Sequence, residues 1–338
     1  MRLFRSKLKG NSRDPVQNLI LFVHGLTGNR ERTWIHSNGT FWPQDLLAND
    51  FPRARIMTYG YDVNVFRNAA TSDLLYDCGQ SLSYSIVSQR IDCSTRPILF
   101  IAHSLGGLIC QQTLILSNTI DGLWQIASSS IGIIFMGTPH YGSSLASYVD
   151  KIAKCMNTGL FTDREFDGTF YPGSNDLYRV GNEFQLMLHR GDLCLRVFCF
   201  YEAFEMSDEV GKIVEEHSAV LRGYENCSVD TNHANMTRFR GRADGCYRLI
   251  QSIIAKWLRD PENEAKKRSA SLGTDSTPCP PWLQPLDTEP FSTPVYAESS
   301  PDFNTWSPVP APPMEERSWV TDTSHFNKFY NTRSSMQK

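Results

Sequence analysis

Residues 102–106, AHSLG, carry the residue type and spacing of a catalytic serine. They fit the nucleophile-elbow pattern G-x-S-x-G, with Ala102 in place of the first glycine. In that pattern the serine lies on a sharp turn from a strand to a helix, and only very small side chains fit two residues to either side. The apolar run RPILFIAHS (96–104) precedes Ser104 and an amphipathic stretch follows it, so the required strand–turn–helix context is present. We therefore predict that Ser104 is a nucleophile.

A serine hydroxyl needs a base, and His233 is the best-placed histidine. In this fold the chain order is serine, acid, histidine, so the base is expected near the end of the ordered region. His233 follows a short strand over 226–233 and precedes a closing helix over 245–258. The other histidines considered lie beside the serine, in helical contexts, earlier in the chain or in the C-terminal segment: His24, His103, His140, His189, His217 and His325.

The acid that orients the imidazole should follow the penultimate strand, which we place over residues 193–204. Glu202 lies at the end of that run and is the preferred acid, with Asp208 as the second choice. Asp230 lies too close before His233 in the chain to be the first choice.

Two backbone N–H groups should form an oxyanion hole. The first is that of Leu105, directly after the nucleophile, and the second is expected in the loop after the first strand, HGLTG (24–28), with Leu26 as donor. The glycines of this loop, Gly25 among them, let the backbone approach a substrate. We expect His24, Gly25, His103 and His140 to line the cleft, and His24 to hold the loop by hydrogen bonding.

Alternating strands and helices must position these residues. Strands are predicted over 17–25, 54–62, 96–104, 130–140, 193–204 and 226–233, and helices over 41–51, 68–89, 105–117, 177–190 and 245–258. This alternation predicts an α/β fold, with a mostly parallel sheet covered by helices on both faces. Each candidate site residue follows a strand, where sheets of this kind bind ligands.

Composition excludes several other classes of protein. The 338-residue chain is 41% hydrophobic and 20% charged, and its net charge of −3 predicts no nucleic-acid partner. The nine cysteines show no CxxC pair and no metal-binding cluster, which indicates a reducing compartment, no metal site and no cofactor. We find no signal peptide and no transmembrane run. These features favour an intracellular, cytoplasmic location, with peripheral association with an organelle membrane as an alternative.

The chain divides into three parts by composition. Residues 1–16 form a basic leader and residues 17–258 the α/β domain. The long segment 141–176 can form a cap over the site or a plain surface excursion. Residues 259–338 are rich in proline, serine and threonine, and we interpret them as a disordered tail.

Six stretches together resemble the fungal lipase-like α/β-hydrolases. This group is similar to the serine-active-site-containing proteins and the wider group of serine esterases. The resemblance covers residues 15–258 and maps Ser104, Glu202 and His233 to the catalytic triad, and Leu26 and Leu105 to the oxyanion donors. It implies phospholipid or acyl-ester substrates. The stretches are LFVHGLTGNRERTW, WPQDLLANDFPRARIMTYGYD, FIAHSLGGLICQQTL, IIFMGTPHYGS, FYEAF and DTNHANMTRF.

The sequence therefore predicts a serine hydrolase that cleaves a small-molecule or lipid ester, or a thioester, through an acyl-enzyme. Two alternatives stay open. The same fold can carry out acyl transfer or product release in a biosynthetic pathway, or it can be a regulatory module that binds partners without turnover. The sequence leaves the oligomeric state open.

Overall fold

The computed structural model describes residues 1–4, 18–26, 28–61, 74–141, 148, 150–152, 154–155 and 175–259. By its contacts the chain falls into two units, Met1–Thr277 and Pro278–Lys338. The second unit lies outside the described residues. So do most of the predicted leader (1–16) and nearly all of the predicted tail (259–338). Most of the segment 141–176 also lies outside, so its cap-like character stays a prediction.

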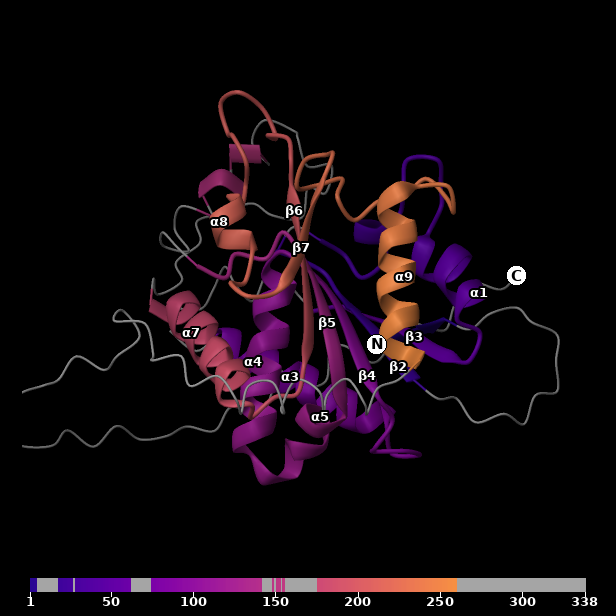
Figure 1. The fold of residues 1–338 in the computed structure, drawn as a ribbon, viewed down its shortest axis with the longest axis vertical. Helices are drawn as coiled ribbons and strands as arrows, with labels where there is room; N and C mark the ends of the chain where they lie inside the picture. The colour runs from indigo at the N-terminus through magenta and orange to yellow at the C-terminus, as the bar shows by residue number, and fades with distance from the viewer. Residues whose placement is uncertain are drawn as a thin grey trace, which may run out of the picture. The chain divides into compact units, whose positions relative to one another are not determined.

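A seven-stranded sheet forms the centre of the molecule (Figure 1). Its strand order is β1-β3-β2-β4-β5-β6-β7, and all neighbouring strands are parallel except β1, which pairs antiparallel with β3. The predicted α/β fold with a mostly parallel sheet is therefore confirmed. The strands are β1 Arg2–Phe4, β2 Asn18–Val23, β3 Ala54–Tyr59, β4 Ile98–His103, β5 Ser130–Met136, β6 Arg196–Glu202 and β7 Glu225–Val229.

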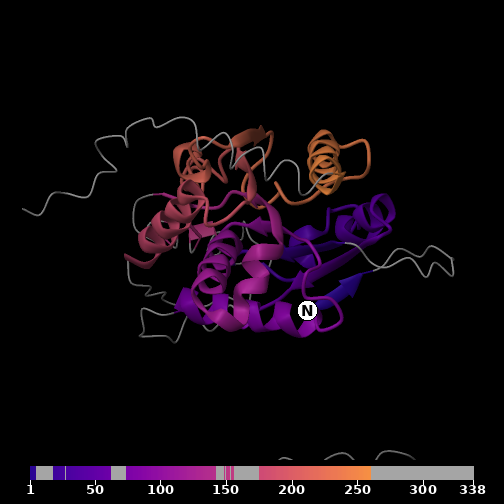
Figure 2. The same ribbon diagram turned by 60° about the horizontal axis from the view of Figure 1, so that its bottom comes forward.

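Helices cover both faces of the sheet (Figure 1, Figure 2). Helices α3, α4, α5 and α7 lie on one face, whereas α1 and α9 lie on the other. No described helix is both long and apolar enough to cross a bilayer. The helices are α1 Ala48–Asp50, which continues the π-helical turn η2 Pro43–Leu47, α3 Leu74–Gln89, α4 Leu105–Thr119, α5 Trp124–Ser129, α7 Asn175–Arg190, α8 Glu216–Ala219 and α9 Gly245–Arg259, with 3-10 turns η1 Arg32–Trp34 and η3 Asp121–Leu123.

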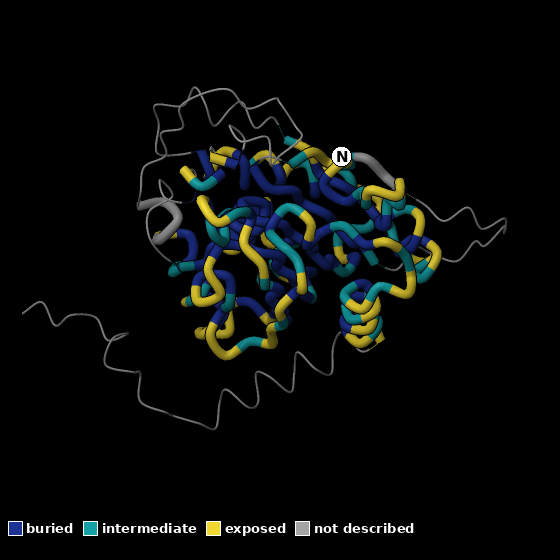
Figure 3. The backbone as a smooth tube through the Cα atoms, turned by 90° about the horizontal axis from the view of Figure 1, so that it is seen from above, coloured by how far each residue is buried: buried dark blue, intermediate teal, exposed yellow. Residues whose placement is uncertain are grey.

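The central strands are apolar on both sides because both sides are covered. In β2, Leu19, Leu21 and Val23 face one core, and Ile20 and Phe22 face the other. This alternation follows from the two-residue period of a strand, and it explains why the sequence shows continuous apolar runs. In Figure 3 the buried backbone gathers in the interior, and the exposed segments lie around it.

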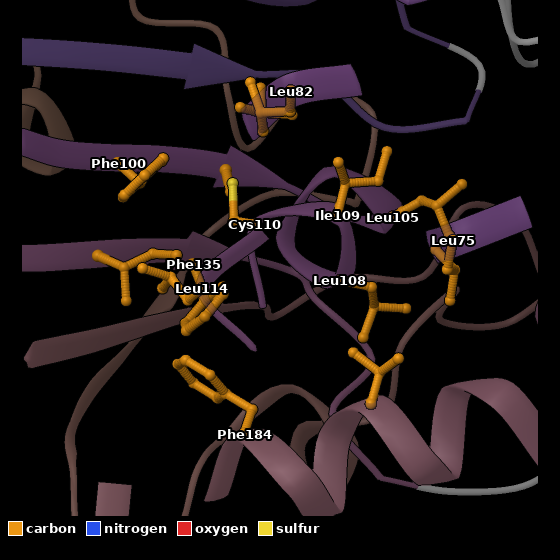
Figure 4. Close-up of a cluster of buried hydrophobic side chains, with 14 of the residues drawn as sticks. Leu75, Leu82, Phe100, Leu105, Leu108, Ile109, Cys110, Leu114, Phe135 and Phe184 are labelled. Atoms are coloured by element: carbon orange, nitrogen blue, oxygen red, sulfur yellow. The ribbon is translucent and has the colours of Figure 1, made fainter. Parts of the chain in front are cut away.

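The first core lies between the sheet and the layer formed by α3, α4 and α7. Figure 4 shows Phe184 of α7 directed toward Leu114 of α4 and Phe135 of β5. The rings of Phe135 and Phe184 meet edge to face, with their centroids 6.1 Å apart. This packing fixes α4 against the sheet, and with it the residue that begins the helix.

The second core is aromatic and ties distant segments together. Trp42 meets the rings of Phe22 and Phe239 at 4.9 Å each, and its indole Nε1–H donates to the carbonyl of Thr237 at 2.8 Å. The Thr237 hydroxyl in turn donates to the carbonyl of Thr33 at 2.7 Å. The loop between β7 and α9, which carries His233, is therefore anchored to the segment after β2.

Candidate active site

The turn between β4 and α4 places Ser104 in a strained conformation. Its φ of 55° and ψ of −127° make it the one non-glycine residue with positive φ in the described part of the chain. A non-glycine side chain avoids this region unless the surrounding structure enforces it, and such strain concentrates at functional sites. The turn leaves Ser104 at the N-terminus of α4, where free backbone N–H groups favour negative charge.

Small residues around the turn are required by close backbone approach. A Cβ on Gly106 would lie 2.4 Å from the carbonyl oxygen of His24 and 2.5 Å from that of Val23. A Cβ on Gly25 would lie 2.8 Å from the Cβ of Ser104. The loop after β2 therefore lies directly against the serine, as the sequence pattern predicts.

The structure brings Ser104, His233 and Glu202 into one hydrogen-bonded series. The Ser104 Oγ lies 2.9 Å from His233 Nε2, and His233 Nδ1 lies 2.6 Å from Glu202 Oε2. All three side chains are buried, at 2% exposure or less. Glu202 is the last residue of β6, and His233 lies in the loop after β7, so the carboxyl ends of parallel strands supply the whole series.

Two further contacts fix the orientation of the series. The second carboxylate oxygen of Glu202 accepts the N–H of Val214 at 2.9 Å. His103 Nε2 donates to the backbone carbonyl of His233 at 3.1 Å, and the two imidazole rings lie 4.8 Å apart. A carboxylate only accepts, so Nδ1 of His233 carries the hydrogen and Nε2 is left to accept a proton from Ser104.

The expected oxyanion donors lie on the two segments that meet at the serine. Leu105 is the first residue of α4 and its N–H has no partner within the helix. Leu26 is buried in the turn after β2, one residue beyond Gly25. Both positions therefore agree with an oxyanion hole, and the donor roles themselves belong to the proposal below.

Tyr148 is a site residue that the sequence analysis missed. Its hydroxyl lies 2.5 Å from Ser104 Oγ, and the backbone N–H of Leu105 is near enough to lower the pKa of this hydroxyl. Tyr148 comes from the segment 141–176, which has no strand pattern or motif around this residue. The one feature of the sequence that suggested a functional role here was the unusual length of that segment.

His24 holds the loop after β2. Its Nδ1 hydrogen-bonds to the carbonyl of Gly25 at 2.8 Å, and its ring stacks on Tyr61 with the centroids 4.4 Å apart. The Tyr61 hydroxyl donates to the carbonyl of His24 at 3.0 Å. These contacts fit the loop-holding role expected for His24.

His140 was expected to line the cleft, and the structure places it in the core instead. Its Nδ1 accepts a hydrogen bond from Gln111 at 2.7 Å, and its ring meets Phe135 edge to face. The chain turns at Gly137, whose φ is +61°, and it is this glycine that lies against the imidazole of His233. His140, three residues later, packs against Gln111, Phe135 and Cys199.

Burial keeps three of these histidines neutral. It lowers the pKa of His24 to about 4, that of His140 to about 3 and that of His103 well below the usual 6.5. For His103, the neighbouring His233 lowers the pKa further.

We expect the free energy of unfolding to fall as the pH drops from about 6.5 toward 4. In that range the unfolded chain protonates His24, His103 and His140 while the folded protein does not, so each contributes a loss of roughly 1.4 kcal/mol per pH unit. Urea unfolding at a series of pH values measures this slope. In the variant His140→Gln, the free energy of unfolding should change less steeply with pH, by roughly 1.4 kcal/mol per pH unit. An unchanged slope would contradict the neutral, buried state of His140.

No group of three or more His, Cys, Asp or Glu side chains suited to a metal ion occurs within the described ranges. All eight cysteines that the structure describes are free.

Comparison with known proteins finds curated relatives that match up to 74% of this chain. Human Protein SERAC1 is 28% identical over 273 residues, covering 74% of this chain and 40% of the relative. The mouse Protein SERAC1 is 26% identical with the same coverage. The chain thus spans about two fifths of the length of the curated relatives it matches.

Solved structures with a similar chain course include a monoglyceride lipase from Saccharomyces cerevisiae. It has a TM-score of 0.43 and 12% identity, and the match covers 77% of this chain and 90% of that chain. A carboxylesterase from Nitrososphaera gargenis also has a TM-score of 0.43 and 12% identity, covering 77% and 100%. The fold assignment above depends on the strand order and the turn at Ser104, not on these likenesses.

One protein-family model matches residues 14–157, the part of the chain that holds β2 to β5 and Ser104. Over these residues the chain is similar to the family described as "Putative serine esterase (DUF676)".

Proposed function

We propose that this protein is a serine hydrolase that cleaves a carboxylic ester or thioester through an acyl-enzyme. The observation that carries the proposal is the continuous hydrogen bonding from Ser104 through His233 to Glu202, with the serine on a strained turn. Nucleophile, base and orienting acid are thus within direct reach of one another, which is the geometric criterion for a serine nucleophile.

In the first half of the reaction, His233 Nε2 removes the proton of Ser104 while Oγ attacks the substrate carbonyl carbon. The carbonyl oxygen becomes an oxyanion, which the N–H groups of Leu105 and Leu26 stabilise. The tetrahedral intermediate then collapses. The imidazolium gives its proton to the leaving alcohol or thiol, and the acyl group stays on Ser104.

In the second half, water takes the place of the alcohol. His233 removes a proton from water, hydroxide oxygen adds to the acyl carbon, and collapse returns the proton to Ser104 and releases the acid. Glu202 keeps its negative charge throughout. It holds the imidazole in the required tautomer and stabilises the imidazolium.

A neutral, apolar acyl group fits this site best. Ser104 is surrounded by Gly25, Leu105, Tyr148 and the imidazole of His233. The one carboxylate in the series, Glu202, is already engaged by His233 and Val214. A lipid-like ester agrees with this environment and with the motif resemblance to fungal lipase-like hydrolases, which rests on the sequence alone.

The extent of the domain and its location are parts of the same proposal. We assign the hydrolase to residues 17–258, with 259–338 as a tail. The free cysteines of the described part, half of which are buried, support a reducing, intracellular location.

The direct test is labelling with a fluorophosphonate probe, followed by product analysis on ester and thioester substrates. We expect the folded protein to be labelled and to release the free acid and alcohol or thiol. If a competing alcohol captures the acyl group in preference to water, the reaction is acyl transfer. If the folded protein neither labels nor turns over any acyl substrate, the hydrolase proposal is wrong and a non-catalytic binding module is favoured.

A further inference from the structure

The hydroxyl of Tyr148 occupies a position that the proposed mechanism needs for substrate. It lies 2.5 Å from the nucleophilic oxygen of Ser104, and the N–H of Leu105, the first residue of α4, lowers its pKa. Tyr148 is itself only 5% exposed, so this contact is shielded from water. A buried hydrogen bond of this kind is costly to break without a replacement partner.

The hydrogen-bond donors and acceptors around Ser104 can be assigned in only one consistent way. For His233 Nε2 to accept the proton of Ser104, the Ser104 oxygen must accept from Tyr148, since the serine has only one hydrogen. The N–H of Leu105 favours negative charge on the Tyr148 oxygen, since it lowers the pKa of this hydroxyl. In this state a lone pair of the nucleophile is bound to the Tyr148 hydroxyl instead of being directed at a substrate.

The same place would be taken by the oxyanion during catalysis. An oxyanion is attached through one carbon to Ser104 Oγ, so it lies close to that oxygen and accepts the N–H of the residue after the serine. The Tyr148 oxygen lies 2.5 Å from Ser104 Oγ, and it is near enough to the N–H of Leu105 for that group to lower its pKa. It therefore stands where the negatively charged oxygen of the intermediate has to stand.

Described residues of the same helical stretch hold Tyr148 in place. Ile152 and Cys155, four and seven residues later, are buried on the same helical face at 1% and 0% exposure. On the outer side, the Lys151 ammonium donates to the carbonyl of Lys212 at 2.6 Å and lies 3.4 Å from Glu215. These packed neighbours and polar contacts therefore fix the position of Tyr148 beside Ser104.

We infer that Tyr148 is an autoinhibitory residue: its hydroxyl fills the oxyanion position, and a substrate binds only when the tyrosine is displaced. This inference rests on the proposed hydrolase function and adds a regulation of that same site. Burial raises the pKa of Tyr148 to about 12, so the hydroxyl stays protonated at neutral pH and deprotonation does not release it. Release requires movement of the side chain away from Ser104.

The variant Tyr148→Phe tests the inference because it keeps the ring and removes only the hydroxyl. Losing the hydrogen bond to Ser104 weakens the closed state, so the fraction of open protein rises. We expect KM for p-nitrophenyl acetate to fall about fivefold or more, with kcat nearly unchanged. The rate of fluorophosphonate labelling should rise by a similar factor, because the phosphoryl oxygen uses the same position.

Tyr59→Phe is the matched control. Tyr59 is also buried, and its hydroxyl bonds to Ser81 at 3.1 Å instead of to the serine nucleophile. We expect this variant to have the KM and labelling rate of the unmodified protein. Thermal unfolding of both variants checks that each is folded.

Each other outcome has a defined meaning. If Tyr148→Phe lowers kcat while the protein stays folded, the hydroxyl assists catalysis and the autoinhibitory role is wrong. Unchanged KM and labelling also contradict it, although the hydrolase function would stand. If neither the unmodified protein nor Tyr148→Phe reacts with the probe, the hydrolase function itself fails, and the inference fails with it.

Discussion

Replacing Ser104 by alanine should lower the rate of ester hydrolysis by about 10⁴-fold or more, to the level that binding and the oxyanion donors alone provide. The variant removes the atom that would carry the acyl group, so no covalent intermediate can form. Steady-state turnover of p-nitrophenyl acetate measures the loss, and mass spectrometry after fluorophosphonate treatment shows whether any label remains. The variant should stay folded, because alanine fits the small space around the turn.

Ser117→Ala is the matched control for this loss. Ser117 is another buried serine of the same helix α4, and its hydroxyl donates to the carbonyl of Leu114 at 2.9 Å. We expect its turnover to remain within about twofold of the unmodified protein. If Ser104→Ala kept most of the activity, a different residue would have to carry the acyl group.

Glu202→Gln should lower turnover by about 10⁴-fold although the side chain keeps its shape. A glutamine amide can donate to Nδ1 of His233, which then places the imidazole hydrogen on Nε2. In that tautomer Nε2 cannot accept the proton of Ser104, and the imidazolium loses its neighbouring negative charge. We expect the loss in kcat/KM for the same ester, with fluorophosphonate labelling slowed in parallel.

The control for the acid is Asp208→Asn, because Asp208 was the second candidate from the sequence. Val214 and His233 engage Glu202, which leaves Asp208 outside the hydrogen-bonded series that the structure describes. We expect Asp208→Asn to retain full activity. Equal losses in the two variants would show that the carboxylate at 202 has no special role.

Most of the sheet could be predicted because its strands are buried on both faces. Runs such as 17–25 and 96–104 are continuously apolar, and they correspond to β2 and β4 within two residues at each end. Strand β1, which pairs antiparallel with β3, was missed, since three residues of a basic segment carry no periodic signal. Helix α5 was also missed because its six residues are too short to show helical spacing.

The site was predictable where a local pattern or chain order determines position. The glycines and Ala102 around Ser104 reflect backbone contacts at the turn, and Glu202 and His233 each follow a strand of the parallel sheet. Contacts between residues that are distant in the chain produce no local sequence pattern, so they were not predicted. The N–H of Val214 is an example, because any residue can supply it, and Tyr148 is another, because nothing near it in the chain predicts that it reaches the serine.

The packing of Trp257 on Gly132 has a consequence for how the chain folds during its synthesis. A Cβ at residue 132 would lie 2.4 Å from the indole ring, so β5 and α9 meet with almost no space between them. Ribosomes release the N-terminal strands first, so β5 emerges long before the α9 residue that covers Gly132. During that interval the face of β5 around Gly132 lacks this cover, and exposed apolar surface of that kind favours aggregation of the growing polypeptide.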